Sequence, residues 1–422
     1  MLLEQIISKP NMLAAYARVV SNKGACGVDG AEAASFAGQL KAEWATIRTS
    51  LETGTYQPKA VRRVKIPKPN GGERKLGIPT YMDRLIQQAI SQELTKMYDP
   101  EFSENSYGFR AAKNAHQALE KAKEYINAGY SHVVDLDLEK FFDRVNHDYL
   151  MNELSKKITD KRVLKLIHKI LRAEIQEDGK STPSKEGVPQ GGPLSPLLSN
   201  IILDKLDKEL EKRGHRFVRY ADDCSIYVKS KRAGERVMAS ISAYIEKELK
   251  LKVNMEKSSV TRPWFSKLLG FTFYYKKGTK LITVHRKSIA SYKEKIRAIT
   301  CRSKPYPMEE RMMQIRRLNH GWGNYFKLSD AKSVFEELDS WVRSRIRLCY
   351  WKQWKKVKTR MHQLEKLGIN PDKAYQWSNT RKGYWRTVHS PILARALNNA
   401  TLNEAGFVSL KDITSPLKTV NV

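Results

Sequence analysis

The sequence predicts an α+β protein in which a mixed part with an antiparallel sheet precedes an all-helical part. Within the first 285 residues, short segments rich in β-branched and aromatic residues lie between turn-forming residues, which is typical of strands and hairpins. From about residue 288 onward the periodicity is helical and the residues are markedly basic. A chain of 422 residues, 41% of them hydrophobic, is long enough for two to four domains with buried cores.

The charge of the chain is strongly positive and uneven. Lys and Arg number 76 against 45 Asp and Glu, which gives a formal net charge of +31. Residues 261–422 alone hold 33 Lys and Arg and 11 Asp and Glu, a net charge of +22. An excess of this size indicates a polyanionic partner. Its clustering among aromatic residues favours nucleic acid over a generically basic or membrane-surface protein.

Cysteines and termini indicate the compartment. The four cysteines lie far apart and show no metal-ligand spacing; they are Cys26, Cys224, Cys301 and Cys349. The first seven residues become charged too early for a signal peptide, and no run of about 18 apolar residues occurs. We therefore expect reduced thiols in a cytoplasmic protein with no membrane span.

The order of elements follows from periodicity and turn signals. Residues 1–60 are predicted to be mostly helical, with a Gly-rich loop at 24–30. Residues 61–66 and 74–79 predict a basic β-hairpin. The remaining expectations are helices over 83–97, 113–128, 147–175, 193–213 and 233–250, a strand over 132–138, and hairpins over 217–228 and 268–285.

Two adjacent carboxylates, Asp222 and Asp223, lie at the tip of the hairpin over 217–228. Like charges at a tip repel and add nothing to a core, but they suit a divalent cation such as Mg²⁺, which takes oxygen ligands. Alone, such a pair is more often only a turn. Asp137 ends an apolar strand about 85 residues earlier. A carboxylate at a strand end and one or two on a neighbouring hairpin can hold two metal ions about 3.5–4 Å apart.

These segments resemble, in order, the motifs of reverse transcriptases, and specifically those of group II intron-encoded proteins. The matching segments are 106–110 (Ser-Tyr-Gly-Phe-Arg), Asp137 with 141–143, 189–196, 220–223, 253–258 and 268–271. The loop at 24–30 resembles the N-terminal extension of this group, and residues 318–326 resemble its maturase, or thumb, domain. The resemblance covers most of residues 15–360.

The resemblance implies a right-hand polymerase with mixed α/β fingers and palm, an antiparallel palm sheet and an all-helical thumb. The expected domains are an N-terminal extension (1–60), fingers and palm (61–285), a thumb or maturase domain (286–365) and a short basic DNA-binding-like tail (366–422). No Cys- and His-bearing nuclease segment is present in the sequence, so we expect no endonuclease domain.

The resemblance also implies an activity. An RNA-directed DNA polymerase would add deoxynucleotides to a primer 3′-hydroxyl with two Mg²⁺ ions, or Mn²⁺ as a substitute. Its partners would be an RNA template and DNA primer duplex, target DNA, and a group II intron RNA whose splicing and retrohoming it assists as a maturase. A splicing-only maturase is disfavoured by the intact carboxylates. A host-domesticated enzyme of defence or repair stays open, as does the choice between monomer and homodimer.

Site residues are carried over from the matching motifs. The metal site would comprise Asp137, Asp222, Asp223 and the backbone carbonyl of Leu138. The nucleotide-binding residues would be Lys68, Arg74, Arg110, Phe142, Gln190 and Lys257. Lys68 and Arg74 would face the triphosphate. The Phe142 ring would block a ribose 2′-hydroxyl, although core packing explains this ring equally well on the sequence alone. Lys257 is a candidate general acid.

Nucleic-acid contacts are expected from both parts of the chain. The candidates are Arg62, Arg63, Gly191, Arg343, Arg347 and Lys355. In the C-terminal helices, cations alternate with rings, as suits a groove that follows a phosphate backbone and stacks on bases. Four of the aromatic residues there are expected to form thumb core instead; they are Trp322, Tyr325, Phe326 and Trp351.

Overall fold

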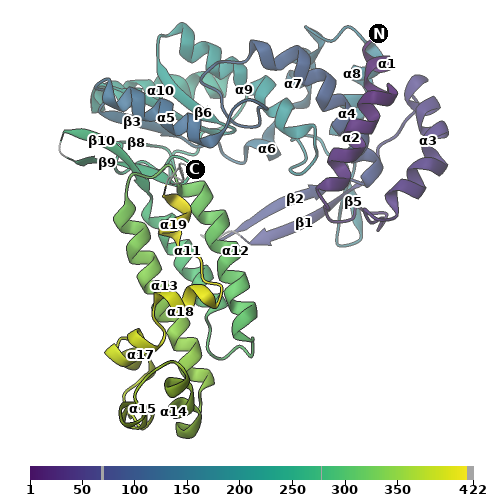
Figure 1. Ribbon diagram of the computed structural model, residues 1–422. Helices are drawn as coiled ribbons and strands as arrows, with labels where there is room; N and C mark the ends of the chain where they lie inside the picture. The colour runs from purple at the N-terminus through teal and green to yellow at the C-terminus, as the bar shows by residue number, and fades with distance from the viewer. Residues whose placement is uncertain (68–70, 277, 416–422) are drawn as a thin grey trace, which may run out of the picture. The chain divides into compact units, whose positions relative to one another are not determined.

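The computed structural model describes residues 1–67, 71–276 and 278–415 (Figure 1). The chain divides into two compact units, one from Met1 to Arg262 and one from Pro263 onward. The first contains two four-stranded sheets, and the second contains a two-stranded sheet and helices. Among the described residues, every helix is too short or too polar to cross a membrane.

The N-terminal residues form helices, as the sequence predicted. They are α1 (Leu2–Ile6), α2 (Lys9–Ser21) and α3 (Phe36–Glu52), and α4 (Tyr81–Tyr98) follows further along. Helix α2 packs along α4. The buried side chain of Asn11 joins them, because its amide donates to the carbonyls of Ile6 at 2.8 Å and Ala89 at 3.0 Å. The N-terminal helices therefore share one hydrophobic core with the rest of this unit.

The first sheet has the strand order β2-β1-β4-β5. The predicted basic hairpin is present as β1 (Val61–Pro67) and β2 (Glu73–Ile78), which pair antiparallel. A second hairpin, β4 (Ile175–Glu177) and β5 (Lys180–Thr182), joins β1 in parallel. The sequence did not predict this second hairpin, because strands of three residues are too short to show an alternating pattern.

The second sheet, the palm sheet, has the order β6-β7-β3-β8 and is antiparallel throughout. Its strands are β3 (His132–Leu136), β6 (Arg216–Tyr220), β7 (Asp223–Val228) and β8 (Ser259–Thr261). Helices α5 (Ala115–Asn127), α9 (Ser195–Lys212) and α10 (Lys231–Glu248) pack against it. The remaining short elements of this unit are η1 (Asp99–Glu101), α6 (Phe141–Arg144), α7 (His147–Ser155) and α8 (Lys161–Leu171). The single helical stretch expected over 147–175 is thus two helices.

The second unit begins with β9 (Phe271–Lys276) and β10 (Thr279–Val284), followed by α11 (Arg286–Ile299), α12 (Met308–Phe326) and α13 (Lys332–Gln353). Shorter helices complete it: α14 (Val357–Lys366), α15 (Pro371–Ser378), α16 (Tyr384–Val388), α17 (Pro391–Ala396), α18 (Asn399–Glu404) and α19 (Leu410–Thr414). We expected β9 and β10 to belong with the palm. They fall in the helical unit because the ring of Phe271 packs on Phe326, with 4.7 Å between centroids.

Aromatic residues form the core of this helical unit. The ring of Trp322 lies 4.5 Å from that of Phe326 and 4.7 Å from that of Tyr292. Phe326 and Trp351 are buried, which confirms their predicted place in the core. Tyr325 differs from the prediction, since 38% of its surface is exposed and its hydroxyl donates to the carbonyl of Leu269.

Candidate active site

Asp137 lies directly beyond the end of β3. Its backbone N–H donates to the hydroxyl of Ser258 at 3.0 Å, and its carbonyl accepts from the N–H of Asn254 at 2.8 Å. These bonds continue the pairing of β3 past its last strand residue, so the position of Asp137 is fixed by the sheet. Leu138, the next residue, is buried and forms a bridge with Val253.

Asp222 lies in the turn between β6 and β7, the palm strands that flank β3 on one side. Burial raises the pKa of the Asp222 carboxyl, and the charge of Asp137 raises it further, whereas Arg74 and Arg219 lower it. The strand register places Leu136 opposite Cys224, so Asp137 and Asp222 lie at the same end of the sheet. Asp223 is exposed and begins β7. No group of three or more His, Cys, Asp and Glu side chains close enough to share a metal occurs among the described residues. Asp223 directly follows Asp222 in the sequence.

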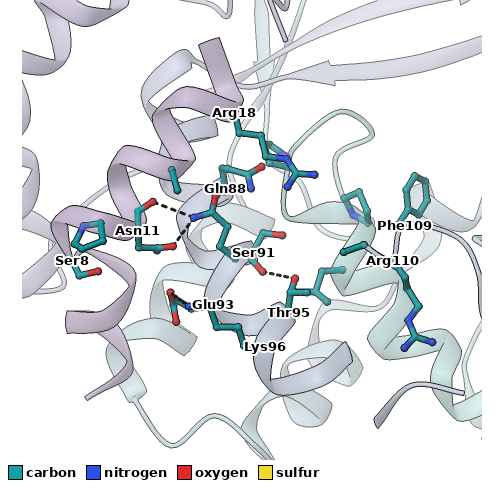
Figure 2. Close-up of a pocket in the computed structure, with 17 residues that line it drawn as sticks. Ser8, Asn11, Arg18, Gln88, Ser91, Glu93, Thr95, Lys96, Phe109 and Arg110 are labelled. Atoms are coloured by element: carbon teal, nitrogen blue, oxygen red, sulfur yellow. Dashed lines mark hydrogen bonds and ion pairs between the residues drawn. The ribbon is translucent and has the colours of Figure 1, made fainter. Parts of the chain in front are cut away.

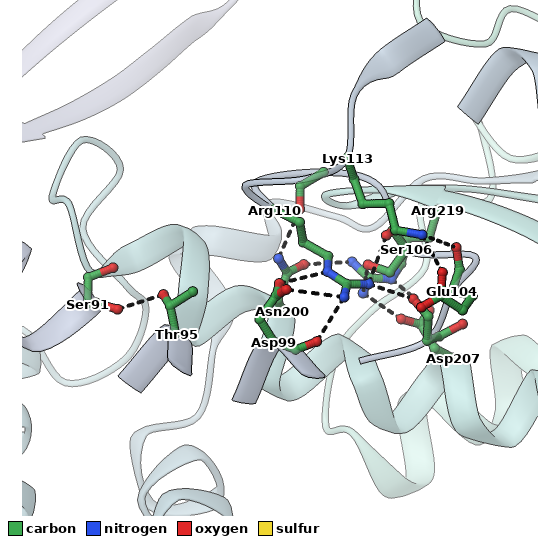
Figure 3. A network of polar contacts seen from close by, with 12 residues as sticks. Ser91, Thr95, Asp99, Glu104, Ser106, Arg110, Lys113, Asn200, Asp207 and Arg219 are labelled. Carbon is green, nitrogen blue, oxygen red and sulfur yellow. Dashed lines mark hydrogen bonds and ion pairs between the residues drawn. The ribbon is translucent and has the colours of Figure 1, made fainter. Parts of the chain in front are cut away.

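The turn that carries Asp222 is held by a buried ion pair (Figure 3). Arg219 of β6 and Asp207 of α9 are both fully buried, and the guanidinium donates to the two carboxylate oxygens at 2.7 and 2.5 Å. Burial alone would lower the pKa of Arg219, but Asp207 raises it, so the guanidinium stays charged.

The other donors of Arg219 reach three different parts of the chain. They bond to the carbonyl of Ala221 at 2.9 Å, the side-chain oxygen of Asn200 at 3.0 Å and the hydroxyl of Ser106 at 2.7 Å. Ala221 has a φ of 56°, in the left-handed region that residues with a Cβ seldom adopt. The network therefore stabilises a strained turn immediately before Asp222.

The segment 106–110 packs directly on this turn. The N–H of Tyr107 donates to the carbonyl of Arg219 at 2.9 Å, and the Asn200 amide donates to the carbonyl of Gly108 at 2.9 Å. A Cβ on Gly108 would lie 2.9 Å from the carbonyl carbon of Tyr220 and would overlap the backbone nitrogen of Ala221. Glycine is required here because two backbones touch.

Arg110 has structural partners rather than an open guanidinium. It bonds to the carboxylate and carbonyl of Asp99 and to the carbonyls of Ser103 and Ser106, and only 6% of its side chain is exposed (Figure 3). The predicted contact with a nucleotide base would need these bonds to be exchanged. In this structure Arg110 supports the segment that packs on the turn carrying Asp222.

The loop over 187–193 is tied to β2 and to α6. The N–H of Gly77 in β2 donates to the carbonyl of Gln190 at 2.8 Å. Gly191 has a φ of 125°, and a Cβ there would lie 2.7 Å from the Gly77 carbonyl oxygen. The N–H of Val188 donates to the carbonyl of Phe142 at 2.6 Å. Three predicted nucleotide or template residues, Gln190, Gly191 and Phe142, are thus joined through backbone bonds. The ring of Phe142 is half-buried beside that of Phe141.

Three of the predicted cations lie in the described part of the basic hairpin. Arg74 is exposed on β2 and acts electrostatically on Asp222. Arg62 and Arg63 on β1 are half-buried, and the Nε atom of each is buried without a hydrogen-bond partner. Lys68 lies outside the described residues. Lys257, the candidate general acid, lies outside this hairpin. Its exposed ammonium lies 3.8 Å from a carboxylate oxygen of Asp137.

A groove of about 770 Å³ lies in the first unit between α2, α4, the loop at 109–111 and the start of α9 with Pro193 before it (Figure 2). Its floor carries amides, with Gln92 donating to the side-chain oxygen of Asn11 at 2.5 Å. Phe109 lines it with 55% of its surface exposed.

The predicted cations of the second unit differ in their surroundings. Arg347 is half-buried on α13 and donates to the carbonyl of Leu397 at 3.0 Å. Burial lowers its pKa, and Arg343 one turn earlier lowers it further. Lys355 is exposed.

Sequence reasoning missed the supporting network. Arg219 stands within an apolar strand segment, and Asp207 and Asn200 stand on an amphipathic helix where polar residues are ordinary. A charged residue among apolar ones was the available signal, since a buried charge needs a partner.

Two families of known proteins match the chain. Residues 66–273 match the family described as reverse transcriptase (RNA-dependent DNA polymerase), and residues 289–368 match the group II intron maturase-specific domain. Protein YkfC of Escherichia coli is 33% identical over 297 residues, which are 61% of this chain and 78% of that protein. The group II intron-encoded protein LtrA of Lactococcus lactis is 31% identical over 312 residues, which are 58% of this chain and 52% of LtrA. This chain therefore spans about half the length of LtrA.

A solved structure titled "Partial Cas6-RT-Cas1--Cas2 complex" is 26% identical, with a TM-score of 0.38, over 59% of this chain and 43% of that chain. The chain belongs to the family of group II intron-encoded reverse transcriptases. Its fold is that of an RNA-directed DNA polymerase, a nucleotidyltransferase, with a maturase-specific domain after it.

Proposed function

We propose that this chain adds deoxynucleotides to the 3′-hydroxyl of a primer on an RNA template, by a two-metal mechanism. The observation that carries this proposal is the placement of Asp137 and Asp222 at the same end of the palm sheet, since Leu136 pairs with Cys224 and the charge of Asp137 raises the pKa of Asp222. Arg74, a phosphate-binding candidate, acts on the same carboxylate. Opposed carboxylates and a nearby cation suit a site for metal-bound triphosphate.

The residues present fit divalent metal. Asp137 and Asp222 supply hard oxygen ligands, and the raised pKa of Asp222 reflects burial and repulsion that a bound cation would offset. We assign the metal to these two residues, with Asp223 and the carbonyl of Leu138 as supporting groups. When bound, Mg²⁺, or Mn²⁺ in its place, lowers the pKa of the primer hydroxyl and neutralises the leaving pyrophosphate.

The remaining side chains orient the substrates. Arg74, with Lys68 beyond the described residues, would bind the triphosphate. Gln190 and Gly191 would contact the nucleotide and the template, and the ring of Phe142 would exclude a ribose 2′-hydroxyl. Lys257 would deliver a proton to the pyrophosphate, which its place 3.8 Å from Asp137 supports. Arg110 would act as a positioning residue for the segment 106–110.

Nucleic acid would be bound largely through charge. Arg62 and Arg63, each with an unpartnered buried Nε atom, are candidates for backbone contacts in the first unit. Arg343, Arg347 and Lys355 are candidates in the second. We propose that the chain also binds a group II intron RNA and target DNA, as an aid to splicing and mobility. The maturase-specific domain supports this role.

Primer extension tests the polymerase proposal. The assay measures DNA synthesis on an RNA template annealed to a DNA primer, with Mg²⁺ and the four deoxynucleotides. We expect synthesis by the wild type, no measurable synthesis by Asp222→Asn, and unchanged synthesis by the control Asp178→Asn. Asp178 is exposed in the β4–β5 turn with a left-handed φ of 50°, which Asn tolerates. Full activity in Asp222→Asn would overturn the assignment.

RNA binding tests the maturase proposal separately. Filter binding at several salt concentrations compares a group II intron transcript with a transfer RNA of similar charge per nucleotide. A maturase should bind the intron more tightly at physiological salt, where non-specific phosphate contacts are weakened. Equal affinity for both RNAs would argue against a maturase role. It would not bear on the polymerase proposal.

A further inference from the structure

A second cavity, of about 400 Å³, lies entirely within the helical unit. The loop between α11 and α12 forms one side, and the C-terminal end of α13 forms the other. Four cations line it: Arg302, Lys304, Arg311 and Lys352. Among the described residues, no carboxylate oxygen lies within 4.0 Å of any of these four, and Glu309 and Glu310 at the start of α12 are outside the lining.

Aromatic rings hold these cations in pairs. Arg302 and Lys352 both lie over the ring of Tyr384, at 5.1 and 5.5 Å from its centroid. Lys304 and Arg311 both lie over the ring of Tyr306, at 5.9 and 5.7 Å. A ring face attracts a cation but carries no net charge, so each pair keeps its full charge and its mutual repulsion. An anion in the cavity would relieve that repulsion.

The loop that presents the cations is fixed in place. Arg311 is buried and donates to the carbonyls of Ile299, Lys304 and Tyr306, which span the loop. Arg345 of α13 donates to the hydroxyl of Thr300 at 3.0 Å and to its carbonyl at 3.2 Å. Two arginines thus order the backbone before any ligand arrives. A preorganised site loses less conformational entropy when it binds.

We propose that this cavity binds a phosphate group. Arg302 and Lys352 are its principal ligands, since they come from different elements and meet over one ring. The phosphate can belong to an RNA backbone or to a free nucleotide, and the cavity volume admits either. The site is separate from the polymerase chemistry, so it can be tested whether or not the proposed polymerisation holds.

The test compares two double variants of equal charge. Arg302→Gln with Lys352→Gln removes the pair in the cavity. Lys366→Gln with Lys373→Gln removes two exposed lysines of the same unit that do not line it. Filter binding of a transfer RNA is measured against salt, and binding of AMP by equilibrium dialysis. Circular dichroism and the Tm check that each variant is folded.

If the phosphate comes from RNA, the cavity variant should weaken binding more than the control and reduce the salt slope of log K by about 1. If it comes from a nucleotide, the cavity variant should lose AMP binding that the control keeps. Equal effects of both double variants on RNA, with no difference in AMP binding, would overturn the proposal.

A third variant separates placement of the cations from their number. Tyr384→Leu keeps every charge but removes the ring that holds Arg302 and Lys352 together. It should weaken phosphate binding while leaving the net charge unchanged, and it serves also if the double variant fails to fold. Binding equal to wild type in a folded Tyr384→Leu protein would contradict the role of the ring.

Discussion

The guanidinium of Arg219 donates a 2.9 Å hydrogen bond to the carbonyl of Ala221, two residues further along the chain. That carbonyl belongs to the residue with a left-handed backbone immediately before Asp222. The charged side chain of one palm strand therefore fixes the backbone turn that aims a candidate metal ligand. A turn held in this way can keep Asp222 in place before metal and substrate bind.

Arg219→Lys tests this relationship. Lysine keeps the charge but has no planar fork, so it cannot bond to Asp207, Asn200, Ser106 and Ala221 at once. We expect kcat to fall by about 10- to 100-fold, because a misplacement of about 1 Å can cost about 100-fold. The KM for deoxynucleotide should change less, and the Mg²⁺ concentration needed for half-maximal rate should rise.

The matched control is Arg216→Lys, an exposed position on the same strand. It should behave as the wild type in rate and in Mg²⁺ requirement. A purely structural role of Arg219 would show as a lower Tm with an unchanged Mg²⁺ requirement in the protein that remains folded. That result would refute the proposal that Arg219 positions Asp222.

Gly108→Ala tests the contact between the segment 106–110 and the same turn. The added methyl would overlap the backbone nitrogen of Ala221 and lie 2.9 Å from the carbonyl carbon of Tyr220, and backbone cannot rotate away as a side chain can. We expect primer extension to fall by at least about 100-fold. Gly38→Ala, in the first turn of α3 with open space around it, should leave the rate unchanged. Wild-type extension by Gly108→Ala would show that the two segments do not need this contact.

The carboxylate pair could be predicted because the signal is local. A hairpin of strand-forming residues around Asp222, and an apolar strand that ends at Asp137, both show in short windows of sequence. The sheet order that brings them together followed from resemblance, and the structure has the corresponding strands adjacent. The basic hairpin was predictable for the same reason, since Val61 to Ile66 alternates apolar and polar residues.

The supporting network could not be predicted because its partners are far apart. Arg219 meets Ser106 across 113 positions of sequence, and only the tertiary fold reveals that contact. For Arg110 the sequence suggested a contact with substrate, because it is a basic residue in a matching motif. In the structure its guanidinium donates to the carboxylate of Asp99 and to the carbonyls of Ser103 and Ser106. A single sequence shows which residues are charged but not which charges are already paired.

The buried side chain of His147 should make the folded state less stable at acid pH. Its Nε2 lies 2.7 Å from the carbonyl of Gly187, and burial lowers its pKa below the ordinary value of 6.5, although that hydrogen bond acts in the opposite direction. A histidine whose pKa is lower in the folded state stabilises the fold above about pH 6.5, and that contribution is lost as the pH falls through the lowered value. The Tm of the wild type should therefore fall between pH 7 and pH 5.

His147→Gln should flatten this dependence, because the amide can donate to Gly187 without titrating. The measurement is the Tm at several pH values in buffers of equal ionic strength, with the exposed His362→Gln as control. The control should follow the wild type. Identical pH dependence in His147→Gln and wild type would assign the acid sensitivity to other groups.

Phe142→Val tests the choice between deoxynucleotides and ribonucleotides. The ring of Phe142 is half-buried and lies 5.2 Å from that of Phe141, which is fully buried. A comparison of variants at these two positions therefore distinguishes nucleotide selection from core packing. A smaller side chain at 142 should admit the 2′-hydroxyl and raise the ratio of ribonucleotide to deoxynucleotide incorporation by at least about tenfold. Phe141→Val should lower the Tm, because it leaves a cavity in the core, and should leave that ratio unchanged. The measurement is primer extension, from which the kcat/KM for each ribonucleotide is divided by the kcat/KM for the corresponding deoxynucleotide. An unchanged ratio in Phe142→Val, with a loss of Tm like that of Phe141→Val, would reduce Phe142 to a packing residue.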